Sequence, residues 1–189
     1  WFSETATLKE VVVGEGVENI VDDAFSGCSI ESVTFNCANV GNWFSETATL
    51  KEVVLSENVT SIGNKAFYNC NALESIAIPN SVTSIGESAF EMCYSLVSAT
   101  LSNSMETIPN SMFYECIGLK NVTIPESITT IGNEAFSDCY ALESITLPNS
   151  VTTVGDNVFS YCDDLESVTL SNAMETIPDS MFIHCSGLK

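Results

Sequence analysis

The chain has 189 residues, and its 25 acidic residues outweigh five lysines and no arginine to give a formal net charge of -20. A charge of this sign repels nucleic-acid phosphates and anionic membrane surfaces, so both are excluded as partners. No run of about 18 apolar residues occurs, so we expect no direct membrane insertion by this segment. Two classes remain for such a chain: enzymes, and proteins that bind or support other proteins.

A repeat runs through the whole sequence. The dodecamer WFSETATLKEVV begins at Trp1 and recurs unchanged at Trp43. Both copies belong to a register of phenylalanines in which seven of the eight spacings are 23 residues and one is 19. A fixed period in this range is the mark of a solenoid, whose units bury their apolar faces by stacking on their neighbours. The register phenylalanines are Phe2, Phe25, Phe44, Phe67, Phe90, Phe113, Phe136, Phe159 and Phe182.

Each repeat contains a predicted strand. In residues 67–90, FYNCNALESIAIPNSVTSIGESAF, the residues Leu73, Ile76 and Ile78 form an L-x-x-L-x-L pattern. Its second half alternates with a period of two, as in a strand with one buried face. Pro79 follows directly and lacks the amide hydrogen that would continue a ladder. The pattern therefore predicts one short strand per repeat.

The rest of the repeat contains a second apolar pair and a compact segment. The pair, Val82 and Ile85, forms either a second short strand or merely extended chain. The segment ESAFEMC then places Ala89, Phe90 and Cys93 at i, i+3 and i+4 spacings. Such spacings put side chains on a common face of a helix. We therefore expect one or two helical turns here, on the side opposite the strand.

The short unit, from Phe25 to Phe44, is the exception to the period. It loses one residue before its strand and three after it, so its return loop shrinks to NCANVGNW. We expect an intact strand, a tightened loop and a local change of curvature. The apolar positions of this strand are Ile30, Val33 and Phe35.

Three motifs carry a resemblance to a known family: L-x-x-[LIV]-x-[LI]-P, [VI]-x-x-[IV]-G and A-F-x-x-C. With them the chain resembles the BspA-type leucine-rich repeats, also called the Treponema pallidum type, across essentially every complete repeat. The resemblance implies an α/β repeat solenoid of 23-residue units, right-handed, with a parallel sheet on its concave face and short helices or turns on the other side. We expect residues 1–189 to form a single leucine-rich-repeat domain of about eight rungs, with the shortened unit at 25–44, as a fragment of a longer chain.

The same resemblance implies a function and a location. Proteins of this family are similar in being secreted or surface-displayed, and some resemble adhesins that contact fibronectin, fibrinogen or neighbouring cells. It implies an extracellular or cell-surface location and a non-catalytic protein-binding role, with no cofactor. The alternative is a passive stalk or spacer that presents another domain. Repeats define a scaffold and surface residues define the function, so the ligand stays open.

Seven of the eight cysteines lie three residues after a register phenylalanine, one per rung. Zinc needs about four ligands that converge on one point, whereas these lie along a line, so we expect no metal site. Disulfides between rungs need Cα separations of about 4.4 to 6.8 Å, less than the expected spacing on this side. We therefore predict buried free thiols at Cys28, Cys70, Cys93, Cys116, Cys139, Cys162 and Cys185. Cys37 breaks the register, and we predict that it is exposed or reactive.

Candidate catalytic groups are sparse. The acidic pairs Asp22-Asp23 and Asp163-Asp164 are typical of solvated turns rather than of acid-base pairs. The only histidine, His184, lies in the last, incomplete repeat, so a Ser-His-Asp site is poorly supported. The sequence therefore predicts no enzyme. Calcium held by loop carboxylates stays an alternative, although the D-x-[DN]-x-[DN]-G loop is missing.

The outward side chains of the strands form the best candidate for a partner-binding face. Stacked Ser and Thr rows have a structural meaning, because β-branched residues suit strands and pair across them. They also form an uncharged surface on an acidic chain, which a protein partner covers without desolvating charge. Both interpretations stay open. The residues of this Ser/Thr face are Ser98, Thr100, Asn121, Thr123, Ser144, Thr146, Ser167 and Thr169.

Five tyrosines fall just after register phenylalanines, at varying offsets. They either cover the rim of the core or anchor a partner, and the sequence does not decide between these roles. The residues are Tyr68, Tyr94, Tyr114, Tyr140 and Tyr161.

Overall fold

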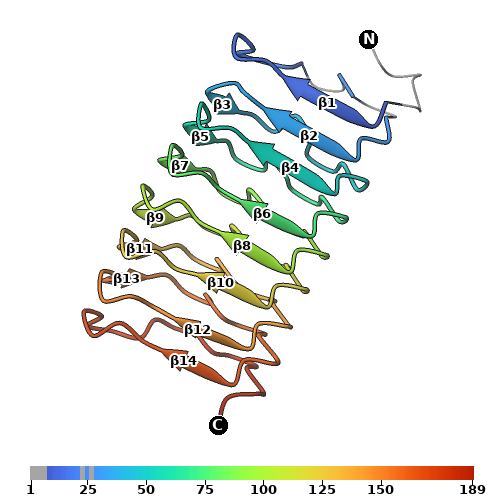
Figure 1. The fold of residues 1–189 in the computed structure, drawn as a ribbon. Helices are drawn as coiled ribbons and strands as arrows, with labels where there is room; N and C mark the ends of the chain where they lie inside the picture. The colour runs from blue at the N-terminus through green and yellow to red at the C-terminus, as the bar shows by residue number, and fades with distance from the viewer. Residues whose placement is uncertain (1–7, 22–23, 26–27) are drawn as a thin grey trace.

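The structure, a computed structural model, describes residues 8–21, 24–25 and 28–189. The chain winds into a parallel-strand solenoid in which each turn, or rung, stacks on the one before (Figure 1). One longer strand per rung lies along one side of the solenoid. In chain order these strands are β1 (Glu10–Val13), β2 (Ser32–Phe35), β4 (Glu52–Leu55), β6 (Ser75–Ala77), β8 (Ser98–Thr100), β10 (Asn121–Thr123), β12 (Ser144–Thr146) and β14 (Ser167–Thr169).

The longer strands pair in parallel within three sheets, β1-β2-β4, β6-β8-β10 and β12-β14. Equivalent residues of neighbouring repeats face one another, so Ser75 pairs with Ser98 and Ser98 with Asn121, each 23 positions on. Each strand alternates as expected, with Ile76 buried between exposed Ser75 and Ala77. The predicted parallel-strand solenoid is therefore confirmed.

The second apolar pair of each repeat forms a second, shorter strand, which decides the alternative left open by the sequence. These strands are β3 (Asn39–Val40), β5 (Ser61–Ile62), β7 (Ser84–Ile85), β9 (Thr107–Ile108), β11 (Thr130–Ile131) and β13 (Thr153–Val154). They form two further parallel sheets, β3-β5-β7 and β9-β11-β13. The glycine after β7 lets two rungs approach closely, because a Cβ on Gly86 would clash with the backbone nitrogen of Asn64.

The predicted helical turns are wrong: the described residues form no helix. In the segment ESAFEMC, Ser88 and Met92 have φ angles of 58° and 60°, in the left-handed region that interrupts a right-handed helix. Their amide groups donate across the rungs instead, from Ser88 to the Asn110 carbonyl at 3.1 Å and from Met92 to the Tyr114 carbonyl at 2.8 Å. The apolar spacing read as helical thus belongs to a chain of turns that pairs with the next rung.

A stack of register phenylalanines fills the core. From Phe67 to Phe182, neighbouring rings lie parallel with centroids 5.4 to 5.9 Å apart. The rings from Phe67 to Phe159 are fully buried. Offset-stacked aromatic pairs add to the free energy gained by burying their area. Each ring thus fixes the position of the rung above it and the rung below it.

The short unit keeps its strand, as predicted. Residues of β2 pair with β1 across 22 positions and with β4 across 20, and all four residues of each strand stay in register. Phe35 fills the inside of this unit, with its ring edge against Phe44 at 5.5 Å and against Phe67 at 6.0 Å between centroids. A larger side chain thus occupies the position that Leu55 holds one rung on.

The prediction that Cys37 is exposed or reactive is wrong, because its side chain is fully buried. Val40 pairs with Ile62, and three positions earlier Cys37 therefore corresponds to Val59, a core residue. The shortened loop removes the residues before this point and draws the cysteine into the core. Its Sγ donates to the carbonyl of Asn39 at 3.3 Å, and burial raises the pKa of the thiol.

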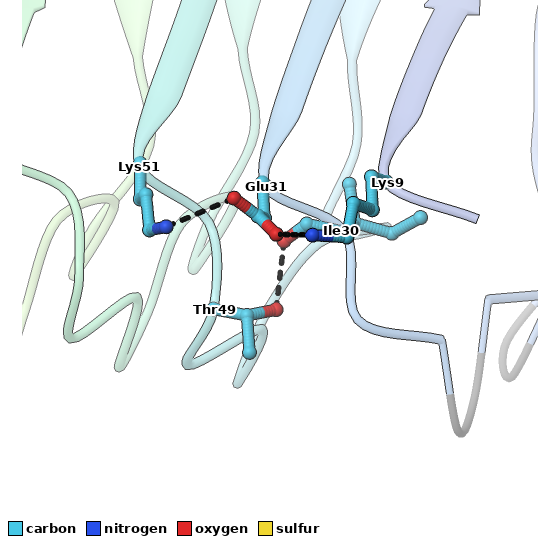
Figure 2. Close-up of polar contacts among 5 residues, drawn as sticks. All are labelled: Lys9, Ile30, Glu31, Thr49 and Lys51. Atoms are coloured by element: carbon cyan, nitrogen blue, oxygen red, sulfur yellow. Dashed lines mark hydrogen bonds and ion pairs between the residues drawn. The ribbon is translucent and has the colours of Figure 1, made fainter. Parts of the chain in front are cut away.

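Three side-chain contacts join the short unit to its neighbours (Figure 2). The Glu31 carboxylate bridges Lys9 at 2.5 Å and Lys51 at 2.9 Å, and the Thr49 hydroxyl donates to the Ile30 carbonyl at 2.7 Å. Hydrogen bonds from Lys9 and then Lys51 lower the pKa of Glu31 to about 2. One carboxylate thus ties together three successive rungs.

Replacing a ring in the middle of the stack is expected to destabilise the protein strongly. Phe113→Ala removes a buried ring that lies 5.7 Å from Phe90 and 5.5 Å from Phe136, and should lower the free energy of unfolding by about 3 to 5 kcal/mol. Urea unfolding followed by circular dichroism measures this change. The exposed control Thr176→Ala should stay within about 0.5 kcal/mol of the wild type. A loss below about 1 kcal/mol for Phe113→Ala would contradict the stack as a source of stability.

The Glu31 bridge makes stability depend on pH in a defined direction. Because its folded pKa lies below the ordinary value of 4.5, the carboxylate stabilises the fold above pH 4.5, and this contribution disappears as the pH falls toward about 2. The melting temperature of the wild type should exceed that of Glu31→Gln at neutral pH, and the difference should shrink between pH 4.5 and 2. Glu57→Gln, at an exposed site elsewhere, serves as the matched control. A difference that is constant across this range argues against the bridge.

Candidate functional site

The structure places the eight predicted residues of the Ser/Thr face side by side on four strands, β8, β10, β12 and β14. The eight residues form two columns that run across the strands. In the first column Ser98 pairs with Asn121, and Ser144 pairs with Ser167. The second column consists of Thr100, Thr123, Thr146 and Thr169. All eight side chains are exposed. The geometry therefore confirms their common position, while their role in binding stays a prediction.

A shallow hollow interrupts this face. The strands β10 and β12 lie next to each other but belong to different sheets, so the hydrogen-bonded ladder stops between them. A hollow of about 430 Å³ lies there, lined on one side by Asn121 and Thr123 and on the other by Ser144 and Thr146. Glu126 also lines the hollow. No feature of the sequence predicts this interruption, because both rungs follow the same repeat.

The face changes character toward the N-terminal rungs. On β1 and β4 the outward columns carry Val12 and Val54, both exposed, together with Glu10 and Glu52. The outward residues are Ser32 and Thr34 on β2, and Ser75 and Ala77 on β6. An unbroken Ser/Thr surface is therefore confined to the four C-terminal strands, and the strands before it carry a mixture of apolar, acidic and small polar side chains.

Five of the seven register cysteines are buried thiols, as the sequence predicts, and the other two are more exposed than predicted. Each Sγ from Cys70 to Cys185 donates to the carbonyl of the register phenylalanine one rung back, at 2.9 to 3.3 Å. The thiols from Cys70 to Cys162 are free and buried, and burial raises the pKa of Cys93 to about 12. A thiol that stays protonated is a poor nucleophile and a poor metal ligand. Cys28 and Cys185 are half-buried.

The described side chains among the candidate catalytic groups do not come together in one site. The Asp22-Asp23 pair lies outside the described residues, Asp163 and Asp164 are exposed, and the His184 ring stacks on Tyr161 with centroids 4.6 Å apart. Within the described part of the chain, no three His, Cys, Asp or Glu side chains are placed to hold a metal ion. In the same part, no helix is long and apolar enough to cross a membrane.

The tyrosines divide between the two roles that the sequence left open. Tyr68 and Tyr114 are half-buried at the rim of the core, whereas Tyr94, Tyr140 and Tyr161 are exposed. Sequence reasoning missed the carboxylates beside them, which occupy the position two residues after the register phenylalanine. The signal was present in the repeat, since that position carries Glu or Asp in two successive rungs.

Fold and surface together define a leucine-rich-repeat solenoid, a class that generally consists of binding modules without catalytic activity. The model of the BspA type leucine rich repeat region matches residues 1–97, 38–162 and 88–189. The chain therefore belongs to the BspA-type leucine-rich-repeat family, which confirms the resemblance. Such repeats indicate binding of other proteins.

Solved structures agree with this assignment. A leucine-rich repeat protein from Bacteroides ovatus is 31% identical over 99% of this chain and 55% of its own, with a TM-score of 0.72. A leucine rich cell surface protein from Faecalibacterium prausnitzii is 27% identical over 89% of this chain and 49% of its own, with a TM-score of 0.57. A leucine-rich repeat protein from T. pallidum is 25% identical over 87% of this chain and 80% of its own, with a TM-score of 0.61.

The chain thus spans about half the length of the first two of these proteins. A search of curated proteins finds no match.

The buried thiols predict a pattern of chemical reactivity. In the native protein at mildly alkaline pH, a thiol-specific colorimetric reagent should modify Cys28 and Cys185 at most, because the other six side chains are buried. All eight should react in denaturant. The double variant Cys28→Ala/Cys185→Ala should react with no more than traces of reagent while folded. Rapid native modification of a third cysteine would contradict the burial described for this row.

Proposed function

We propose that this segment is a non-catalytic protein-binding module, secreted or displayed at a cell surface, whose Ser/Thr face adheres to host extracellular proteins or to other cells. Membership of a binding-module family supports the class of function. The description of the Faecalibacterium prausnitzii relative as a cell surface protein supports the location.

The observation that carries the proposal is the uncharged, exposed surface on β8, β10, β12 and β14 of a chain with a net charge of -20. Hydroxyl and amide groups lose less hydration free energy than carboxylates when a partner covers them. The cores of protein interfaces are accordingly depleted of charged residues. The backbone under this surface is held by parallel pairing within β8-β10 and β12-β14, so the side chains are ordered before a partner arrives.

The hollow between β10 and β12 supplies a place for an anchoring side chain of the partner. Asn121 and Ser144 face it with groups that donate and accept hydrogen bonds, and the methyl groups of Thr123 and Thr146 offer apolar contact. Interfaces commonly depend on a few side chains that fill such depressions.

The second candidate is a passive spacer. Columns of Thr and Ser also stabilise parallel strands by packing across them, as Thr100 does with Thr123. The similarity of successive rows favours this role, because a recognition surface usually varies from one repeat to the next. The experiment below separates the two.

Immobilised protein should bind fibronectin or fibrinogen saturably at physiological salt. Changing Thr100, Thr123, Thr146 and Thr169 together to Lys puts four cations on the face and should weaken binding by at least about tenfold. The matched control changes four exposed threonines that precede the shorter strands, Thr60, Thr83, Thr129 and Thr152, to Lys. Circular dichroism checks that both variants stay folded.

Loss of binding in the first variant alone supports the Ser/Thr face as the adhesive surface. Equal loss in both variants means that net charge, and not the face, governs binding. Absence of binding by the wild type leaves the spacer as the better description of this segment.

A further inference from the structure

A second surface lies in the turns that lead into β8, β10 and β12. Tyr94, Ile117 and Tyr140 occupy the same position in three successive rungs, four residues before each strand, and are 36%, 38% and 42% exposed. We call these three residues the tyrosine row. Large apolar side chains that stay exposed at one position of three adjacent rungs form a continuous patch, which is unlike scattered surface residues.

Backbone contacts hold the tyrosine row in place. The amide of Ala141 donates to the Ile117 carbonyl at 3.2 Å, and the amide of Asp164 donates to the Tyr140 carbonyl at 3.0 Å. At the start of the row, Gly118 lies so close that a Cβ there would be 2.8 Å from the Tyr94 carbonyl oxygen. The row is therefore ordered without a partner, which lowers the entropic cost of binding.

Carboxylates border the row. The Tyr94 hydroxyl donates to Glu115 at 3.4 Å, and the Tyr140 hydroxyl donates to Asp138 at 3.1 Å. Asp138 also accepts a bond from Ser137 at 2.7 Å. Glu115 and Asp138 have left-handed φ angles of 56° and 59°, the conformation that pairs these turns with the next rung.

The electrostatic potential at the row is negative. The pKa of the Tyr140 hydroxyl is raised, first by its hydrogen bond to Asp138 and then by burial and the charges of Asp138, Glu115 and Asp163. Burial together with the charges of Asp138, Glu115 and Glu134 raises the pKa of Tyr114, beside the row, to about 12. The carboxylates that help to keep these hydroxyls protonated would also stabilise a cationic side chain of a partner.

We propose that the tyrosine row binds an extended segment of a partner protein that carries two cationic side chains three residues apart. Each cation lies against the face of Tyr94 or Tyr140 and pairs with the carboxylate that the tyrosine contacts. Cations are attracted to aromatic faces, and the chain already shows this contact once, where the Lys65 ammonium lies 5.0 Å from the Tyr68 ring centroid.

The geometry of parallel strands sets the spacing of the two cations. Rungs repeat about every 4.8 Å, so the positions of Tyr94 and Tyr140, two rungs apart, are separated by roughly 10 Å. An extended segment in the polyproline II conformation rises about 3.1 Å per residue with three residues per turn, so side chains three residues apart lie on one face and roughly 9 Å apart. An acidic segment would be repelled by Glu115, Asp138 and Asp163, and a purely apolar one would desolvate them without compensation.

The test uses two fluorescent peptides of the same composition, Ala-Arg-Ala-Ala-Arg-Ala and Arg-Arg-Ala-Ala-Ala-Ala, with binding followed by fluorescence polarisation at low and physiological salt. The first peptide should bind more tightly than the second. Tyr94→Ala/Tyr140→Ala should weaken its binding about 5- to 30-fold, since an exposed cation-aromatic contact contributes about 0.5 to 1 kcal/mol per ring. Tyr94→Phe/Tyr140→Phe keeps both rings and should retain most of the affinity.

Two double variants, each of which removes two carboxylate charges, test whether the carboxylates beside the row matter more than the overall charge of the protein. Glu115→Gln/Asp138→Asn should weaken binding and reduce its dependence on salt. Glu57→Gln/Glu106→Gln removes the same charge from exposed sites elsewhere and should change little. Equal effects of the two pairs would overturn the proposal in favour of general attraction to an acidic protein, as would equal binding of the two peptides.

The Ser/Thr face is tested separately from the tyrosine row. The variant with lysine at 100, 123, 146 and 169 should still bind the first peptide about as well as Glu57→Gln/Glu106→Gln does, because its substitutions lie outside the row. Unchanged peptide binding by folded Tyr94→Ala/Tyr140→Ala would overturn the inference while leaving adhesion through the Ser/Thr face untouched.

Discussion

Hydrogen bonding between rungs is the constraint on which the rest of this structure depends. A single rung is too short to satisfy its own backbone, so its amides and carbonyls pair with the rungs before and after it. Three columns do this: the longer strands, the shorter strands, and the left-handed turns around the register phenylalanines, where Phe90 donates to Met112 and Phe113 to Ala135. The 23-residue separation of paired residues in β6, β8 and β10 follows, because equivalent atoms must meet in successive rungs.

Once the backbones are in register, equivalent side chains of successive rungs stack on one another. The phenylalanine rings lie face to face from Phe67 to Phe182, and every thiol from Cys70 onward reaches the carbonyl of a phenylalanine one rung back. The same rule acts on the surface, where it aligns threonines on the longer strands and exposed apolar side chains in the turns. Both candidate binding surfaces are therefore products of the repeat, and their chemistry depends on which residues vary within it.

The sequence predicted the parallel solenoid, the intact strand of the short unit and the positions of the Ser/Thr face, because a period and an alternation determine all three. Prediction from the sequence failed where one spacing of apolar residues fits two different structures. Ala89, Phe90 and Cys93 suit a helix and a left-handed turn equally, and only the pairing of Ser88 with the next rung distinguishes them. Cys37 looked exposed because the deletion before it hid its correspondence to Val59. The hollow between β10 and β12 and the contact of Tyr140 with Asp138 depend on local packing, which no repeat pattern encodes.

The interruptions of the two strand columns are staggered. The longer strands are unpaired between β4 and β6 and between β10 and β12, and the shorter strands are unpaired between β7 and β9. At each of these places the other column runs through, since β5 pairs with β7, β11 with β13, and β6 with β8. An interruption in one column of strands therefore never falls between the same two rungs as an interruption in the other column. A force along the solenoid axis therefore acts on at least one hydrogen-bonded strand ladder at each of these interruptions. The rungs on either side cannot be pulled apart there without breaking that ladder.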